Sequence, residues 1–396
     1  MNVMEESGLL VEKLEETLKH IKKLSMRTYL KFLPKIELHA HLNGSLNDKI
    51  LKELGCEEDS IMQYKKLTQS IDKSDNTLQE CFDVFKIAQN ATKTQESVYL
   101  ATKSVIEDFV RDGVVYLELR TTPRSEINMS KEEYIESVIR GIESLSGSKE
   151  KIFVKLILSI DRRHDKKTSE ESLKIILKMR EKYPNIIKGI DFSGNPNAGE
   201  FDAALFEEAR KNGLKTSIHC AEIQNDDETK RILEFGPDRI GHATYLHPLY
   251  GGSQENWDLY CKKKIPVECC LTSNVVCGTS QSFPEHHIQE WINGSLPFSI
   301  NTDDKGVFST SLSREYQLVQ RHFKLTGSNL WQISYDAIDY SFASAKEKEK
   351  MQYYLLQWLY LCHDMIYKKV DPNIDDDFCE GIADGFWNKL HMLEQQ

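Results

Sequence analysis

The chain has 396 residues, 40% of them hydrophobic, and a formal net charge of −11 at pH 7. This length can bury one barrel-sized core or two smaller ones, and the acidic balance argues against nucleic acids and anionic membranes as partners, since both attract basic surfaces. Nine cysteines without a paired CxxC spacing indicate neither a disulfide framework nor a thiolate zinc site. With no long apolar run and no signal peptide pattern, we expect a cytoplasmic protein with no membrane span.

The first segment is predicted to be an amphipathic helix over residues 5–31. Its apolar side chains recur at three- to four-residue spacing among Glu and Lys: Leu9, Leu10, Leu14, Leu18, Ile21 and Leu24. We expect residues 1–31 to form a helical extension that packs on the following domain, rather than a helix that binds a membrane or a partner.

Residues 35–45, KIELHAHLNGS, predict a short strand that runs into a turn containing Gly44. Side chains two positions apart share one face of a strand, so His39 and His41 can point at one small volume, as two imidazole ligands of a first-row metal ion must. Two histidines at this spacing can also be a hydrogen-bonded pair in a core. The rest of the chain decides between these alternatives.

A helical region is predicted over residues 76–112, and strands then alternate regularly with helices. The predicted strands are 114–120, 152–161, 186–194, 214–222, 239–243, 265–273 and 298–304, and the helices between them are 130–142, 169–184, 201–211, 226–235, 253–264 and 284–293. With the first strand, this gives eight strands separated by helical segments, which predicts an α/β fold of the (β/α)₈ barrel type. A doubly wound sheet would be expected to carry a Gly-rich phosphate turn after its first strand, and the sequence has none there.

The last part of the chain is predicted to be helical, over 311–325, 330–343, 346–369 and 379–393. Aromatic residues at helical spacing are far more often core than cofactor site, so these helices are interpreted as cover for the barrel. We expect a barrel domain over residues 32–345 and a C-terminal helical extension over residues 346–396.

Polar residues collect at one position in this pattern, at or just past the carboxyl end of each predicted strand. They are His39, His41, Arg120, Asp161, Gly194, His219, Glu222, His242, Ser273, Asp303 and Asp304. In a barrel all these strand ends meet at one mouth, which is where barrel enzymes place their active sites. Scattered structural histidines would have no reason to collect there, so the pattern favours metal binding.

Three imidazoles and one carboxylate, from His39, His41, His219 and Asp303, suit Zn²⁺ with a position left for water. Such a metal lowers the pKa of its water toward about 7, which provides a nucleophile at neutral pH. Glu222 follows His219 by three residues, beyond the strand end, where it can reach the reacting atoms without binding the metal. It is the predicted general acid.

His242 is predicted to orient or deprotonate the attacking water, and Asp304 to face the substrate, because adjacent side chains diverge and Asp303 is assigned to the metal. Both residues have a structural alternative. His242 can be a core histidine, and Asp304 can be a helix N-cap.

Four motifs in this order and spacing resemble the adenosine/AMP deaminase family over roughly residues 32–345: His39-Ala-His41-Leu, His219-Cys-Ala-Glu222, Arg239-Ile-Gly-His242 and Asn301-Thr-Asp303-Asp304. Within the family, Asn43-Gly44-Ser45, Leu271-Thr-Ser-Asn274 and the run from Asp303 to Phe308 are most similar to the adenosine deaminase-like branch, which removes methylamine from N(6)-methyl-AMP. The resemblance implies a zinc-dependent barrel hydrolase that replaces the 6-amino or 6-alkylamino group of a purine nucleotide by oxygen. Deamination of the nucleoside adenosine is the alternative.

The resemblance also implies roles for individual residues. His39, His41, His219 and Asp303 would hold one Zn²⁺, Glu222 would protonate the ring nitrogen beside carbon 6, and His242 would assist the water. Asp304 would bond the imidazole edge of the base, and Gly194 would offer its backbone to the other ring. The sequence departs from the family pattern at Ala243, which replaces a Gly, and at Gln89, which aligns with a substrate-contacting His of the deaminase-like branch.

The phosphate prediction rests on Asn43. At this position adenosine deaminases have an Asp that bonds the free 5′-hydroxyl, and the neutral amide removes a charge that would repel a 5′-phosphate by roughly 4 kcal/mol at 4 Å and an effective dielectric of 20. The first choice for the phosphate donors is the segment from Arg120 to Arg124, with Thr121, Thr122 and Pro123, ahead of Arg162, Arg163 and Lys305. Asp161 at the mouth completes the predicted substrate contacts. Surface ion pairs are the alternative for these cations.

Two other classes stay open at this point. A metal hydrolase of the wider amidohydrolase type often holds two metals through a carboxylated lysine, but Gly194 stands at the end of the predicted fourth strand where that lysine would be. A barrel protein that binds without catalysis is the other, and it would have no need of Glu222 together with all four ligands. We expect a small-molecule nucleotide substrate and a monomer.

Overall fold

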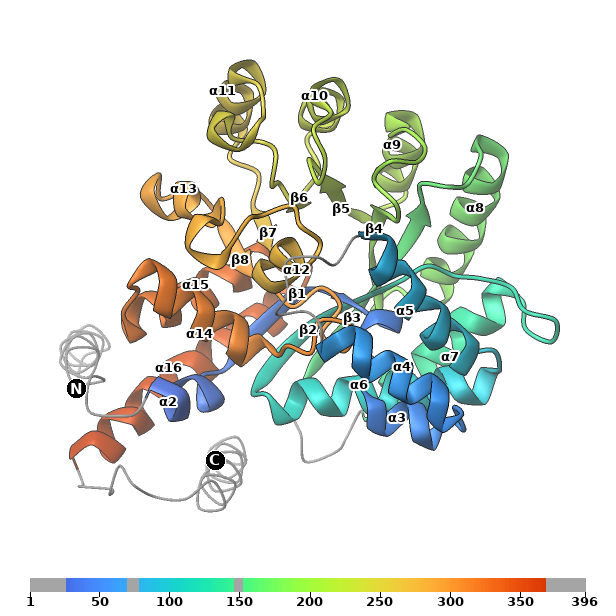
Figure 1. Ribbon diagram of the computed structural model, residues 1–396, viewed down its shortest axis with the longest axis horizontal. Helices are drawn as coiled ribbons and strands as arrows, with labels where there is room; N and C mark the ends of the chain where they lie inside the picture. Colours follow the sequence, from blue (N-terminus) through green and yellow to red (C-terminus); the bar gives the residue numbers. More distant parts are fainter. Residues whose placement is uncertain (1–25, 70–77, 146–151, 368–396) are drawn as a thin grey trace.

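The computed structural model describes residues 26–69, 78–145 and 152–367 (Figure 1). The predicted helix over 5–31 therefore lies mostly outside the described residues, apart from α2 (Met26–Phe32), and the predicted helix over 379–393 lies wholly outside them. Among the described helices, none is long and apolar enough to cross a membrane.

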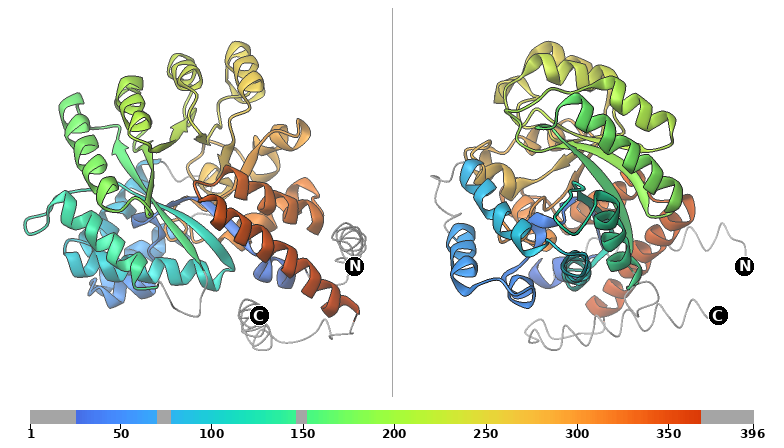
Figure 2. Two further views of the ribbon diagram at one scale, coloured as in Figure 1. Left: turned by 180° about the vertical axis from the view of Figure 1, so that it is seen from behind. Right: turned by 90° about the vertical axis from the view of Figure 1, so that its right-hand side faces the viewer.

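Eight parallel strands follow one another around a barrel in sequence order, with the helices outside them (Figures 1 and 2). The strands are β1 (Lys35–His41), β2 (Val114–Thr121), β3 (Phe153–Asp161), β4 (Ile187–Ser193), β5 (Lys215–Cys220), β6 (Arg239–His242), β7 (Val267–Cys269) and β8 (Phe298–Ile300). Side chains on one face of each strand fill the barrel and those on the other face meet the helices, which is why every residue of β2 is buried. The predicted (β/α)₈ fold is confirmed.

The first and last strands are joined at their carboxyl ends. The backbone N–H of Asp303 donates to the His39 carbonyl at 2.8 Å, and the N–H of His41 donates to the Asp303 carbonyl at 3.0 Å. Below this bridge, the Glu37 carboxylate accepts from the backbone N–H and the hydroxyl of Thr302. The residues that close the barrel are therefore the metal ligand candidates or their immediate neighbours.

The helices are α3 (Asp48–Glu53), α4 (Glu58–Gln69), α5 (Leu78–Ala91), α6 (Gln95–Arg111), α7 (Lys131–Glu143), α8 (Lys166–Lys182), α9 (Ala203–Lys211), α10 (Asp226–Phe235), α11 (Gln254–Lys263), α12 (Leu271–Val276), α13 (Ile288–Asn293), α14 (Leu312–Phe323), α15 (Gly327–Tyr340) and α16 (Ala345–Tyr367), with short 3₁₀ turns η2 (Asn43–Ser45), η4 (Pro248–Tyr250) and η5 (Phe283–Glu285). Many begin at the residue types that cap helices. Ser130 and Thr94 form capping boxes at α7 and α6, and Asp165 caps α8.

The structure corrects several predicted elements. The helical region 76–112 is two helices, because Thr94 caps a new start after α5. The strand predicted over 265–273 ends at Cys269, and Leu271–Val276 is α12, a turn of helix that brings Asn274 toward the mouth. The helix predicted over 284–293 is interrupted between η5 and α13. Helices α3 and α4 had no counterpart in the prediction.

The C-terminal helices cover the barrel on the side of β1 and β8 (Figure 1). Trp358 of α16 packs edge-on against Tyr29 of α2, with ring centroids 4.9 Å apart, and the Trp331 indole of α15 donates to the Leu355 carbonyl at 3.2 Å. Their interpretation as barrel cover is confirmed for the described part. The domain limits at residues 31 and 345 remain predictions.

Candidate active site

Four predicted ligands meet at the mouth. One ligand atom from each of His39, His41, His219 and Asp303 lies within 4.8 Å of the others. The Asp303 Oδ1 atom is 3.4 Å from the Nε2 atoms of both His39 and His41, and the Nε2 atoms of His41 and His219 are 3.3 Å apart. Strands β1 and β5 and the loop after β8 thus deliver donors to one point, as the sequence pattern predicted.

Buried carboxylates orient two of these imidazoles from behind. Glu268 of β7 accepts from His39 Nδ1 at 2.7 Å, and Asp191 of β4 accepts from His219 Nδ1 at 2.9 Å. Each bond holds the proton on Nδ1 and leaves the Nε2 lone pair facing the cluster, the arrangement typical of metal-binding histidines. The Nε2 atom of His39 is buried and has no hydrogen-bond partner among the described residues, so a cation at this point would satisfy it.

Glu268 is itself held as a carboxylate by two buried arginines. Arg120 Nη2 donates to it at 2.7 Å and Arg239 Nε at 2.5 Å. Burial alone would raise the pKa of Glu268, but these two guanidinium charges hold it well below its ordinary value. A negative charge behind His39 makes its imidazole a better donor to a metal ion.

The backbone at the site is unusual, and two glycines make room for the ligands. Asp303 and His242 both have left-handed backbone, with φ of 58° and 61°, a conformation that non-glycine residues rarely adopt and that gathers at functional sites. A Cβ on Gly241 would lie 2.9 Å from the His39 ring, and one on Gly44 would overlap the Asp304 carboxylate. This explains the Gly before His242 and the Gly after Asn43 in the sequence motifs.

Glu222 and His242 face the cluster without belonging to it. His242 Nε2 lies 3.7 Å from a Glu222 carboxylate oxygen and 3.8 Å from Asp303 Oδ2. Burial lowers the pKa of His242 to about 4, so its ring is neutral at pH 7. The position at the mouth disfavours the alternative that His242 is an ordinary core histidine.

Asn43 lies at the rim, where the structure adds a residue that the sequence did not indicate. The Thr92 hydroxyl, at the end of α5, is 3.5 Å from Asn43 Oδ1 and accepts from Arg124 Nη2 at 2.7 Å. Arg124 also donates to the Thr92 carbonyl and to Glu126, while its buried Nη1 has no hydrogen-bond partner in the described part of the chain. Arg124 is thus linked to Asn43 through Thr92, and it has one N–H donor group, Nη1, that no described residue accepts from.

Several predicted phosphate donors are placed elsewhere. Arg120 lies fully buried in the barrel beneath the candidate metal ligands, where it holds Glu268, so its prediction as a substrate contact is wrong. Thr121 points to the outer face of β2 and bonds Tyr134 of α7 at 2.6 Å, because successive strand residues face opposite sides. Arg162 pairs with Glu228, and Arg163 with Asp161.

The other predicted contacts lie near the mouth. Gly194 has a φ of 109° and sits against Asp161, whose carboxylate accepts from the Arg163 backbone and guanidinium. Gln89 is exposed on α5, and Thr122 and Pro123 follow β2. Their contact with substrate remains a prediction. Asp304 is not a helix N-cap, since Ser311 caps α14.

The residues that sequence reasoning missed are those that act through others: Asp191, Glu268, Asn274 and Thr92. A single acidic residue inside an apolar strand was a usable signal for Asp191 and Glu268, because a buried charge needs a partner. Asn274 stands in one of the motifs that carry the family resemblance, but that motif assigned it no role. Thr92 carried no signal, since its role depends on the helix end that positions it.

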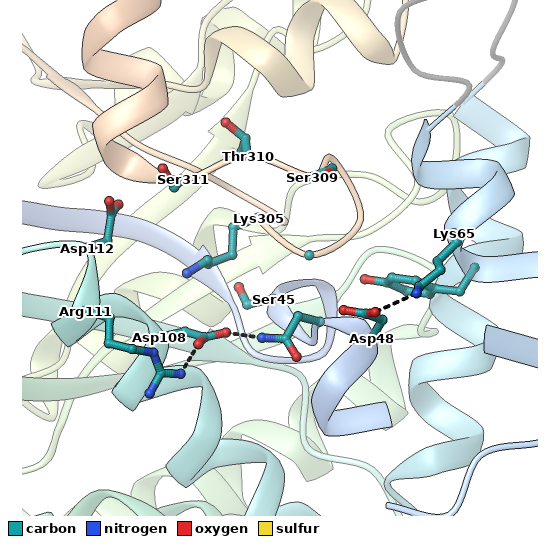
Figure 3. A pocket seen from close by; sticks show the side chains of 13 residues that line it. Ser45, Asp48, Lys65, Asp108, Arg111, Asp112, Lys305, Ser309, Thr310 and Ser311 are labelled. Atoms are coloured by element: carbon teal, nitrogen blue, oxygen red, sulfur yellow. Dashed lines mark hydrogen bonds and ion pairs between the residues drawn. The ribbon is translucent and has the colours of Figure 1, made fainter. Parts of the chain in front are cut away.

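A separate cavity of about 540 Å³ lies between α4, α6 and the loop after β8 (Figure 3). Most of its charges are paired within it, Arg111 with Asp108 and Lys65 with Asp48. The Lys305 ammonium packs 4.5 Å from the centre of the Phe109 ring in this cavity, and so lies apart from the candidate metal ligands. This position disfavours the prediction of Lys305 as a phosphate donor.

The chain matches known proteins along most of its length. The Adenosine deaminase family model matches residues 34–358. N6-Methyl-AMP deaminase of Bos taurus is 41% identical over 331 residues, covering 82% of this chain and 94% of the relative. A solved structure of Arabidopsis N6-mAMP deaminase is 38% identical and covers 83% of this chain and 98% of its own, with a TM-score of 0.73. Arabidopsis ADAL complexed with IMP is 37% identical, with a TM-score of 0.72 and coverage of 85% and 98%.

Proposed function

Because this chain belongs to the adenosine deaminase family and is a purine deaminase, we propose that it hydrolyses N(6)-methyl-AMP to IMP and methylamine. The observation that carries the proposal is the placement of an acid, Glu222, beside a cluster of three imidazoles and one carboxylate. The names of the similar proteins support the nucleotide substrate. The two-metal hydrolase is not favoured, since β4 presents Asp191, which is bonded to His219, whereas its lysine, Lys188, lies near the start of the strand and donates to the Pro184 carbonyl.

The metal in this proposal is Zn²⁺. Three neutral imidazoles and a carboxylate at one point are its usual donors, and the carboxylates behind His39 and His219 fix both rings in the ligating tautomer. When bound there, Zn²⁺ supplies Lewis acidity and lowers the pKa of water at the site toward about 7.

The protein groups move the protons. Glu222 donates a proton to the ring nitrogen beside carbon 6 as oxygen adds to that carbon, which relieves the negative charge that would develop on the ring. The carboxylate so formed can then take the proton of the added oxygen and pass it to the departing methylamine. His242, 3.7 Å from Glu222, faces the oxygen that adds. Asp304 accepts a hydrogen bond from, or donates one to, the imidazole edge of the base.

The rim selects a nucleotide over a nucleoside. The Asn43 amide carries no charge, and Arg124, held in place by Thr92, brings a guanidinium with an unused buried N–H close to it. A phosphate there would gain a charge-assisted hydrogen bond from Arg124, and the amide N–H of Asn43 can also donate to it.

The test compares Asn43→Asp with the wild-type protein. A carboxylate at position 43 should repel the 5′-phosphate and lower kcat/KM for N(6)-methyl-AMP by at least about tenfold, or 1.4 kcal/mol. Asn43→Ser removes the amide without adding a charge and serves as the control. Rates are measured as methylamine or ammonia release from N(6)-methyl-AMP and adenosine. If wild type prefers adenosine, or if Asn43→Asp leaves the nucleotide rate unchanged, the proposed substrate is wrong.

A further inference from the structure

A chain of hydrogen bonds behind His242 begins at a backbone N–H group, which can only donate a hydrogen bond. The backbone N–H of Ile288, at the start of α13, donates to Nδ1 of His286 at 3.1 Å. His286 is fully buried, which lowers its pKa well below the ordinary value, so the ring is neutral and carries a single proton. Since Nδ1 accepts, that proton is on Nε2.

The tautomer of His286 determines the direction of its hydrogen bond to Asn274. His286 Nε2 lies 3.0 Å from Asn274 Oδ1, so the imidazole N–H donates to the amide oxygen. This fixes the amide: its Nδ2 group faces His242 Nδ1 at 3.2 Å and Thr279 Oγ1 at 3.3 Å. The Thr279 hydroxyl donates to the backbone carbonyl of Asn274 at 3.1 Å. A lone pair on Thr279 Oγ1 is therefore left to accept from the side-chain amide of Asn274.

The opposite orientation of the amide is excluded by the same contacts. If Asn274 were flipped, its N–H₂ group would face the N–H of His286, donor against donor. Moving the His286 proton to Nδ1 would only transfer the conflict to the N–H of Ile288. One assignment therefore satisfies every contact in the chain, and in it Asn274 donates to Nδ1 of His242.

We propose that Asn274 and His286 are positioning residues that hold the proton of neutral His242 on Nε2, the ring nitrogen that faces Glu222 and Asp303. His242 then presents a hydrogen-bond donor to the oxygen that attacks carbon 6, and orients that oxygen instead of deprotonating it. His287 supports the arrangement, since its Nε2 bonds the His242 carbonyl at 2.8 Å and so holds the left-handed backbone there. This inference rests on the proposed function for its consequence, while the tautomer itself can be observed independently.

The decisive variant is Asn274→Asp, which keeps the shape of the side chain and reverses its polarity toward His242. A carboxylate accepts from an imidazole N–H, so the proton should move to Nδ1 and Nε2 should lose it. We expect kcat for N(6)-methyl-AMP to fall on the order of 10²- to 10⁴-fold with a smaller change in KM, as for other catalytic histidines held in the wrong tautomer. The tautomer is read from long-range ¹H–¹⁵N spectra of the zinc-loaded protein labelled at its histidine rings.

Two further variants separate polarity from packing. Thr279→Val removes a contact of Asn274 without changing what faces His242, and should keep the Nε2 tautomer and at least about half of kcat. His286→Leu frees the amide to turn, and should give a mixture of His242 tautomers even where Asn274→Asp fails to fold. A wild-type His242 protonated on Nδ1, or an Asn274→Asp protein with unchanged tautomer and kcat, would overturn the proposal. Lack of activity on every purine nucleotide with the Nε2 tautomer present would overturn the function alone.

Discussion

Two carboxylates at the mouth are distinguished by what surrounds each of them. Asp303 contacts two imidazole Nε2 atoms at 3.4 Å, whereas Glu222 contacts the imidazole of His242 at 3.7 Å. This difference supports the proposed roles, Asp303 as a metal ligand and Glu222 as a group that meets substrate. Loss of either carboxylate should abolish activity for a different reason.

Glu222→Gln should separate the two roles. The amide cannot donate the proton that a carboxylic acid gives to the ring nitrogen, so turnover should fall on the order of 10²- to 10⁴-fold, while zinc content should stay near one per chain. Zinc is measured by elemental analysis and turnover by methylamine release. Glu200→Gln, at an exposed residue that pairs with Arg231, controls for the substitution itself. Loss of zinc from Glu222→Gln would show that Glu222 is a ligand.

The sequence could predict the candidate ligands because strand spacing and strand ends determine where they lie. It could not predict how deeply a long side chain is buried in the barrel. His39 and His41 are two apart on one strand, and the other ligands follow strand ends, so topology alone brings them together. Arg120 also precedes a strand end, yet its long side chain turns inward and meets Glu268. Which way such a side chain runs depends on a partner contributed by β7, 148 residues away.

At the scale of one element, β1 shows how a single strand can place its polar residues in different environments. Lys35, Glu37, His39 and His41 alternate with apolar residues, and the pairing of β1 with β2 is irregular after Lys35 and again between Glu37 and Ala40. The first, Lys35, is fully buried and donates to the carbonyls of Leu30 and Leu33 at the end of α2. The last two, His39 and His41, belong to the group of candidate metal ligands. One strand thus supplies both an anchor for α2 and two of the candidate ligands.

Lys35 predicts a measurable pH dependence of stability. Burial lowers its pKa to about 8, partly offset by Asp112, whereas the unfolded chain has the ordinary value of 10.5. Between these values the unfolded state binds more protons, so the free energy of unfolding should rise with pH. Relative to Lys35→Met, wild type should gain about 3 kcal/mol from pH 8 to 10.5.

Urea unfolding of both proteins across this pH range measures the difference, and Lys49→Met, which removes an exposed ammonium on α3, is the control. A difference between wild type and Lys35→Met that is constant or falls with pH would mean that the two carbonyls keep Lys35 charged, with an ordinary pKa.

Elements without strong periodicity were the ones that the sequence misassigned. The apolar run Ile265–Ser273 has the composition of a buried strand, but after Cys269 the chain turns into α12, held by bonds such as Asn274 N–H to the Cys270 carbonyl. A short apolar run cannot be told from a buried helix by its pattern alone. This misassignment affected the functional prediction, because α12 carries Asn274 and its position next to His242 could not be foreseen.

At the scale of the whole molecule, the group of candidate metal ligands joins parts of the chain that are far apart in sequence. Its ligands come from β1, β5 and the loop after β8, and the last of these bridges back to β1 through backbone hydrogen bonds. A cation bound there ties the first strand to the last at the seam where the barrel closes. Metal binding should therefore stabilise the fold as well as enable the reaction.

Removal of zinc should lower the melting temperature, and only in proteins that retain the four metal-ligating residues. A site saturated at 1,000 times its dissociation constant adds about 4 kcal/mol to the free energy of unfolding, which for a chain of this size corresponds to a Tm lower by on the order of 5 °C after chelation. Scanning calorimetry at several zinc concentrations measures the shift.

Asp303→Ala should lose zinc and activity together and should melt at the same temperature with and without the metal. Asp304→Asn, which keeps all four ligands, should still respond to zinc. A zinc-replete Asp303→Ala protein, or a Tm that chelation does not move, would contradict the assignment of the ligand set at the barrel seam.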